Sequence, residues 1–284
     1  MTESSQTKLL LILVTLVAAA ITALTVGSAK AAPGPGTGAS FVVNCDINFE
    51  DGIVADPIAL THHQHVESGS ELFNNDITAA SVRDPSNGTS CIDLEDKSAY
   101  WTPLLYEDSG MALEPTLNDI YYRGGVAPSS VVAFPYSTQM LANQASRVSW
   151  ECRTATVQQL ADAPSSCAGT LVAIIHFPQC WNGDKPAKMD DFRYPINRGC
   201  SAPFDRVVPA MTQRWSFKAP DGEINGVKVS AGDGQLEDQS FEHADFLNGW
   251  DQARLRFLIK DCIKAVPSSG TRPDRCRLID PAKL

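Results

Sequence analysis

Three of the five histidines in the chain lie within the segment Thr61-His62-His63-Gln64-His65. In an extended segment successive side chains point to opposite faces, so His63 and His65 project from the same face. Two imidazoles on one face can ligate a metal ion or share a proton transfer. The alternative is a polar loop whose histidines hydrogen-bond to neighbouring backbone, so the pair indicates a site only if a third group joins it.

His243 is the best candidate for that third group, because it lies in Glu242-His243-Ala244-Asp245 with a carboxylate on either side. The sequence therefore predicts that one divalent metal ion is bound by His63, His65 and His243, with Asp245 assisting. In the alternative interpretation Asp245 only caps a helix and His243 makes a local hydrogen bond. His176 lies in an apolar segment, which predicts a partly buried, hydrogen-bonded histidine and not a ligand.

Carboxylates and aromatic residues offer other chemistry. Asp96 follows Asp93 and Glu95 and precedes Tyr100-Trp101, and two carboxylates at a suitable separation can hydrolyse a glycoside. We include Asp96 among the candidate catalytic residues. Aromatic side chains could also stack on sugar rings, although core packing explains them equally well; the candidates are Tyr100, Trp101, Tyr106, Tyr121, Tyr122 and Trp181.

Several functions lose support. The chain has no G-x-S-x-G, H-E-x-x-H, P-loop or G-x-G-x-x-G motif. Its net charge of −10 repels polyanions, and it has no cluster of Lys and Arg, so we expect no nucleic-acid partner. A neutral or cationic partner is easier to accommodate. The sequon Asn87-Gly88-Thr89 predicts an exposed loop.

The first residues predict export. Lys8 precedes an uncharged apolar run from Leu9 to Val26, and Ala29-Lys30-Ala31 has small residues at the spacing of a signal-peptidase site. Residues 1–31 are therefore interpreted as a cleaved signal peptide of a secreted protein that has no membrane contact after cleavage. If the run is not cleaved, it is just long enough to span a bilayer and to anchor the protein.

The cysteines support the same compartment, because all eight follow the predicted signal peptide. No C-x-x-C spacing occurs, which argues against a tetrahedral zinc site and a thioredoxin-like motif. Disulfides are the better interpretation. The short separations of Cys152 from Cys167 and of Cys262 from Cys276 suit local loops, but the sequence alone does not fix the pairing.

The elements that must position these residues are mostly strands. Short apolar segments between turn residues predict strands at Phe41–Val43, Ala99–Tyr106, Val131–Phe134 and Leu171–Phe177. Alternation at 215–217 and 227–229, with Asn225-Gly226 as a turn, predicts a hairpin.

Two helices are also expected. A helix is predicted from about Leu247 to Cys262, with Asp245 as its cap, and a shorter one from Val157 to Ala161.

The predicted fold class is mostly β, resembling a β-sandwich or jelly roll, with a few packed helices, including one near the C-terminus, and with disulfide stabilisation. We expect a flexible linker at 32–40, a single globular domain at 41–266, and a C-terminal tail at 267–284 tied by Cys276.

Several segments resemble one family: Asp56-Pro57-Ile58, His63-Gln64-His65, D-K-S-A-Y-W-T-P-L-L-Y at 96–106, F-P-Q-C-W-N-G at 177–183 and H-A-D-F-L-N-G-W-D at 243–251. Together they resemble the secreted domain of unknown function numbered nineteen-ninety-six, found in fungi and actinobacteria, over Val43 to Cys262. The second and last segments carry the family's H-x-H and H-A-D-F histidines, which correspond to His63, His65 and His243. Fungal members can carry modules associated with carbohydrate or cell-wall binding, so the resemblance implies a role facing wall polysaccharide.

The chain departs from the family pattern at Met189 to Tyr194, where the family typically shows another pair of histidines. If the family uses five histidines, this chain has lost part of the site or has replaced it with Asp190 and Asp191. Its activity would then be altered or absent.

Three functions remain open. The chain could be a hydrolase or lyase that acts on cell-wall or extracellular polysaccharide through His63, His65, His243, Asp245 and Asp96. It could instead be a non-catalytic carbohydrate- or cell-wall-binding protein, or an interaction protein without a small ligand. An enzyme should gather the histidines and a carboxylate, whereas a binding protein should expose a row of Trp and Tyr.

Overall fold

The computed structural model describes residues 39–55, 62–73, 77–231, 234–238, 240, 242–266 and 271–279. These residues all belong to one compact unit that spans Ala32–Leu284. The predicted signal peptide at 1–31, most of the predicted linker and parts of the predicted tail lie outside the described residues. The first strand begins at Ser40, one residue before the start that the composition predicts.

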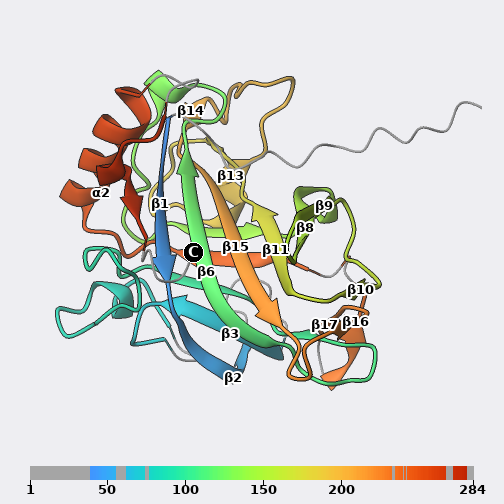
Figure 1. The fold of residues 1–284 in the computed structure, drawn as a ribbon. Coiled ribbons are helices and arrows are strands. Elements are labelled where there is room, and N and C mark those ends of the chain that lie inside the picture. The colour runs from blue at the N-terminus through green and yellow to red at the C-terminus, as the bar shows by residue number, and fades with distance from the viewer. Residues whose placement is uncertain are drawn as a thin grey trace, which may run out of the picture. The chain divides into compact units, whose positions relative to one another are not determined.

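The larger sheet has seven strands, of which β1, β6, β15 and β11 lie side by side in Figure 1. All neighbouring strands are antiparallel except β20 and β1, which are parallel. Their order is β20 (Arg277–Leu278), β1 (Ser40–Cys45), β6 (Glu114–Arg123), β15 (Ala210–Lys218), β11 (Thr170–His176), β8 (Val148–Arg153) and β9 (Val157–Leu160).

The second sheet has five strands, and every neighbouring pair is antiparallel. Their order is β2 (Ile47–Ala55), β3 (His62–Gly69), β4 (Ala99–Pro103), β19 (Ala244–Leu247) and β7 (Gln139–Ala142). This sheet positions the histidine segments, because β3 carries the first and the residue before β19 is His243.

The two sheets share one apolar core. Alternate residues of the larger sheet, such as Phe41, Ile120 and Ala173, belong to the same buried cluster as Val66 of β3 and Phe246 of β19. Burial of such side chains stabilises the fold by about 25 cal/mol per Å² of apolar surface. The arrangement is a disulfide-stabilised β-sandwich, so the predicted fold class is confirmed.

Polar groups also join the two sheets. Asn118 of β6 donates a hydrogen bond to Ser68 Oγ of β3 at 3.0 Å, and Gln213 of β15 donates one to the carbonyl oxygen of Asp245 at 2.8 Å. These buried bonds satisfy polar groups that would otherwise weaken the interface.

The outer face of the five-stranded sheet is covered by chain as well. Ala99, Trp101 and Leu247 form a second apolar cluster with Ile77 and Val82, which come from the segment between β3 and β4. Val82 lies in the 3₁₀ helix η1 (Ser81–Arg83). The face that carries the histidines is therefore not fully open to solvent.

Smaller elements complete the described structure. Three small sheets pair β10 (Ser166–Cys167) with β16 (Ile224–Asn225); β12 (Cys180–Trp181) with β13 (Phe192–Arg193) and β14 (Arg206–Val207); and β17 (Lys228–Ser230) with β18 (Leu236–Glu237) and β5 (Leu105–Tyr106). Further 3₁₀ helices are η2 (Pro128–Ser130), η3 (Ala145–Arg147), η4 (Met189–Asp191) and η8 (Asp274–Cys276).

The C-terminal helix is present but begins later than predicted. It comprises α2 (Gln252–Leu258) and a π-helical continuation, η7 (Ile259–Lys264). Asp251 caps it by accepting a hydrogen bond from Arg254 N at 2.7 Å. The predicted start at Leu247 and the cap at Asp245 are wrong, because both residues pair with β4 and β7 as part of β19. None of the described helices has the length and apolar character needed to cross a bilayer.

Two other local predictions are wrong. Val131–Phe134 forms no strand, although Val131 and Phe134 are buried in the core as irregular chain. Val157–Leu160 is not a helix but the strand β9, because it pairs with β8 at the edge of the larger sheet. In both segments tertiary contacts outweigh local preference.

The predicted hairpin at 215–229 is also wrong. β15 pairs with β6 and β11, whereas β17 pairs with β5 and β18. Gly226 does adopt a positive φ of 74°, and its N–H donates to the carbonyl oxygen of Ser165 at 2.8 Å. The turn residue was correctly identified, but its partners lie elsewhere in the chain.

All eight cysteines form disulfides: Cys45–Cys91, Cys152–Cys167, Cys180–Cys200 and Cys262–Cys276. The two short pairs are those that the spacing favours. The Cys262–Cys276 disulfide joins η7 to η8, which directly precedes β20. Each closed loop of about 15 residues stabilises the fold by roughly 3 kcal/mol.

The sequon does not mark an exposed loop, because Asn87 is only 2 % exposed. Its Oδ1 accepts hydrogen bonds from Ser70 Oγ and Leu72 N, and its Nδ2 donates to Ser70 Oγ and to the carbonyl oxygen of Val82. The amide therefore holds the covering segment onto the end of β3.

We predict that Asn87→Ala lowers the free energy of unfolding by about 1–3 kcal/mol, because buried partners lose their hydrogen bonds. Chemical denaturation measures this change. Asn143→Ala, at an exposed position, is the matched control and should change stability little. Equal stability of the two variants would contradict the structural role of Asn87.

Candidate metal centre

Strand pairing places the three histidines on one face of the five-stranded sheet. Val66 points into the core, so its neighbours His65 and Glu67 point to the outer face. His65 pairs with Pro103 across the strands, and Asp245 pairs with Trp101. Continuing the second pairing by two residues puts His243 opposite Pro103 as well, which brings it into the same row as His65.

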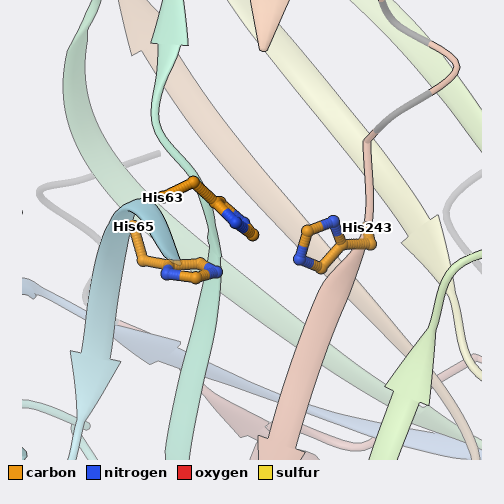
Figure 2. A group of neighbouring side chains, drawn as sticks. All are labelled: His63, His65 and His243. Atoms are coloured by element: carbon orange, nitrogen blue, oxygen red, sulfur yellow. The ribbon is translucent and has the colours of Figure 1, made fainter. Parts of the chain in front are cut away.

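The three imidazoles are in contact distance of one another. One potential ligand atom from each of His63, His65 and His243 lies within 4.8 Å of the others. The ring centroids are 4.1 Å apart for His63 and His65, 5.1 Å for His63 and His243, and 5.8 Å for His65 and His243. Figure 2 shows the rings converging from β3 and from the chain that enters β19.

This spacing suits one metal ion. Nitrogen ligands lie about 2.0–2.1 Å from zinc, so two nitrogens of a tetrahedral site are about 3.3 Å apart. Side-chain adjustments of roughly 1 Å would bring the three rings to that geometry.

Burial keeps the β3 imidazoles in the form that binds metals. Desolvation, followed by the neighbouring His243, lowers the pKa of His63 to about 4. Desolvation lowers the pKa of His65 well below its usual value. Both rings are thus neutral at pH 7, and a neutral imidazole offers a lone pair to a cation.

His65 has two polar ring nitrogens and is completely buried. Neither of its ring nitrogens makes a well-formed hydrogen bond within the described structure, although the backbone of His63 lies near enough to favour the charged ring weakly. A buried polar group without a hydrogen bond costs about 1–3 kcal/mol. A metal–nitrogen bond would compensate this cost.

Asp245 is a carboxylate that lies beside the cluster. It is completely buried on β19, and its Oδ2 lies 3.7 Å from His243 Nε2. Carboxylates close to a ligating histidine orient the ring and make it a stronger ligand. The structure therefore brings together four of the five predicted site residues.

Two further buried acids near the cluster were missed from the sequence. Glu67 follows His63 and His65 on the same face of β3, and burial raises its pKa to about 9. Burial likewise raises the pKa of Glu242 to about 8. The period-two pattern H-x-H-x-E would have identified Glu67, because all three side chains must share a face.

The protonation of Glu242 follows from its contacts. Thr102 Oγ1 lies 2.6 Å from Glu242 Oε1 and 2.6 Å from the carbonyl oxygen of His243. A hydroxyl has only one proton to donate, so a protonated Glu242 satisfies the second contact by donating to Thr102. Both this geometry and the raised pKa favour a neutral Glu242, which fixes the backbone next to His243.

Asp96 is not part of the histidine cluster. It is fully buried elsewhere, where its Oδ2 accepts a hydrogen bond from Tyr100 Oη at 2.7 Å and its Oδ1 accepts one from Ser98 N at 3.2 Å. Tyr100 in turn contacts Tyr122, which accepts a hydrogen bond from Trp250 Nε1. This network lies inside the sandwich, which indicates a structural role for Asp96.

The cysteine sulfurs beside Asp96 cannot complete a second metal site. Atoms of Cys45, Cys91 and Asp96 lie within 4.8 Å of one another. The two cysteines, however, form a disulfide, and a metal ion requires a thiolate.

Asp190 and Asp191 do not contribute to the histidine cluster among the described residues. They lie in η4, whose Met189 packs against the outer apolar cluster. Asp191 accepts hydrogen bonds from Lys188 N and Asn182 Nδ2, which stabilises a local turn. The segment therefore lies over the same sheet, but its carboxylates are used for local structure.

His176 lies on β11 of the other sheet, with Nδ1 3.0 Å from Thr212 Oγ1. It is therefore separate from the histidine cluster.

The aromatic residues give little support for sugar stacking, because all five tryptophans and two of the candidate tyrosines are buried. Those side chains are Trp101, Trp150, Trp181, Trp215, Trp250, Tyr100 and Tyr122.

Fold and site define a β-sandwich with a buried cluster of three histidines on the outer face of one sheet. The family model described as a domain of unknown function, DUF1996, matches residues 51–250. The chain belongs to this family, and both histidine segments lie within the matched region. Neither a search of curated proteins nor a search of solved structures gave a match.

We predict that Asp96→Asn flattens the dependence of stability on pH. Burial raises the pKa of Asp96 to about 7, above the value of about 4 in an unfolded chain. The folded state thus retains a proton that the unfolded state releases. The stabilisation is complete below about pH 4 and is lost as the pH rises to about 7.

The free energy of unfolding, measured by denaturation between these pH values, should fall less steeply in Asp96→Asn than in the native protein. The exposed Asp274 provides the control Asp274→Asn, which should retain the native slope. Identical slopes in all three proteins would show that Asp96 is ionised in the folded state.

Proposed function

We propose that the protein is an exported metalloprotein in which His63, His65 and His243 hold one divalent transition-metal ion. The observation that carries this proposal is the separation of at most 4.8 Å among ligand atoms of three buried imidazoles from two distant segments. Zinc suits such a set best, since many zinc enzymes combine three protein ligands with one position for water or substrate.

The metal ion would activate a bound water or polarise a substrate oxygen. Asp245, beside His243, would hold that ring in its ligating orientation. Glu67 lies on the same face of β3 as two ligands, and its raised pKa makes it able to donate a proton near neutral pH. These groups together provide a site for metal-assisted hydrolysis or elimination.

We propose cell-wall or extracellular polysaccharide as the substrate. Four disulfides and the predicted signal peptide support action outside the cytoplasm. We expect no nucleic-acid partner and, after signal cleavage, no membrane partner. A purely carbohydrate-binding role through stacked aromatics has less support, because every tryptophan is buried.

The purified protein, after treatment with zinc and removal of excess metal, should contain one equivalent of zinc by elemental analysis. His65→Ala should retain less than a tenth of an equivalent, since loss of a zinc ligand leaves only two imidazoles. Circular dichroism checks that the variant is folded.

The matched control is His176→Gln, which removes an imidazole from the other sheet and should keep the full equivalent. Metal retained equally by the native protein and by both His65→Ala and His63→Ala would exclude this site.

We also predict that the metal site is catalytic. Cleavage of a panel of cell-wall polysaccharides, followed by new reducing ends and by the absorbance of unsaturated sugars, distinguishes hydrolysis from elimination. Glu67→Gln should reduce the rate by about 10²–10⁴-fold with the metal still bound, because general acid–base catalysis contributes that much. Asn143→Ala should keep the native rate. Normal activity of a metal-free His65→Ala would refute a catalytic metal.

A further inference from the structure

The outer face of the seven-stranded sheet carries a group of arginines that the histidine site does not use. The inward face of β6 holds Ile120 and Tyr122, so Tyr121 and Arg123 point outward. In the strand registers Tyr121 pairs with Thr212, and Thr212 pairs with His176. Arg214 lies two residues from Thr212 on β15 and so shares this face.

Three guanidinium groups surround the ring of Tyr121. Their central carbons lie 4.6 Å from the ring centroid for Arg123, 5.7 Å for Arg214 and 5.4 Å for Arg272. Cation–π attraction to one ring offsets part of the repulsion among them. We call Tyr121, Arg123, Arg214 and Arg272 the Tyr121 cluster.

Arg147 adds positive charge beside this cluster. The pKa of His176 is lowered to about 4, first by burial and then by Arg123, Arg147 and Arg214. His176 is thus a neutral group whose Nδ1 contacts Thr212. Arg147 stacks on Tyr194 at 4.7 Å, and Tyr194 Oη donates to the carbonyl oxygen of His176 at 2.9 Å.

The carboxylates near the cluster are already engaged. Glu151 forms ion pairs with both Arg214 and Arg153. Asp119, which accepts a hydrogen bond from Asn44, has its pKa raised by burial despite the nearby Arg214. Neither of these two carboxylates forms an ion pair with Arg123.

Arg123 is a poorly compensated cation. It forms no ion pair with any carboxylate in the described part of the chain. Its Nη1 donates to Thr212 Oγ1 at 2.8 Å, but its Nε is buried without a hydrogen bond within the described structure. Burial, together with the nearby charges of Arg214 and Arg272, lowers the pKa of Arg123 to about 10. A desolvated cation is costly unless an anion accompanies it.

We propose that the Tyr121 cluster is a binding site for an oxyanion, a carboxylate or a phosphate group of an extracellular ligand. The planar fork of a guanidinium matches both groups and can donate two hydrogen bonds to either. Tyr121, Arg123 and Arg272 are only partly buried, so a ligand can approach from solvent. The site does not depend on a bound metal, because it lies on the outer face of the other sheet.

The net charge of the chain differs in sign from the local charge of the Tyr121 cluster. The chain carries a formal charge of −10, which favours neutral or cationic partners at long range. Salt screens exposed charges beyond about 8–10 Å, so a ligand group at Tyr121 responds chiefly to the nearby arginines. An acidic chain can therefore bind an anion at one place.

Isothermal titration calorimetry at low ionic strength tests the proposal with three probes: trigalacturonate, inorganic phosphate and uncharged maltotriose. We expect at least one of the two anions to bind with a stoichiometry of one, and maltotriose not to bind. Arg123→Met and Arg272→Gln should each weaken binding at least about tenfold, the loss expected for a charge-assisted hydrogen bond. Arg123→Lys should weaken it as well, because lysine lacks the fork.

Arg256→Ala is the charge-matched control, since it removes one exposed arginine from α2 and should leave affinity unchanged. Thermal melting confirms that each variant folds, and Arg272→Gln carries the test if Arg123→Met does not fold. Binding of trigalacturonate alone identifies an acidic sugar as the ligand class, and binding of phosphate alone identifies a phosphate group. Failure of both anions to bind, or equal weakening by Arg256→Ala, would overturn the proposal.

Discussion

The alternation of side chains across β3, β4 and β19 determines where every candidate group lies. Val66, Tyr100 and Phe246 must point inward to fill the core between the sheets, and their neighbours must then point outward. Shifting one strand by a single residue would bury the histidines in the core and expose the apolar residues. The energy of the core thereby fixes the register that aligns His65 with His243, although neither histidine belongs to that core.

Much of the site could be predicted because it depends on local periodicity. His63 and His65 had to share a face once their segment was extended, and the flanking acids made His243 a reasonable partner. Their meeting could not be derived from spacing, since His65 and His243 are 178 positions apart in the chain and only strand pairing brings them together. Asp96 was misplaced for the same reason. Its chemistry suits catalysis, but Tyr100 and Ser98 bind it inside the sandwich.

The errors in the fold have a common physical origin. The hairpin at 215–229 and the helix at 157–161 were predicted from patterns within a few residues. In the structure, β15 and β17 pair with strands that are distant in the sequence, and β9 pairs with the preceding strand β8 at the edge of the larger sheet. The helix start was placed too early because Leu247 is as apolar as a helix residue, and only pairing with β4 makes it a strand. The predicted mostly β class is nevertheless confirmed, since it depends on many short segments and not on any one of them.

The parallel pairing of β20 with β1 has a consequence for the behaviour of the protein in solution. β1 would otherwise present a line of unpaired backbone N–H and C=O groups at the border of the larger sheet, and such borders recruit strands from other molecules. Val42 and Val43 are instead matched by Arg277 and Leu278, and the Cys262–Cys276 bond tethers this cover to the helix. Removal of β20 would thus expose this border of β1 to pairing with strands of other molecules.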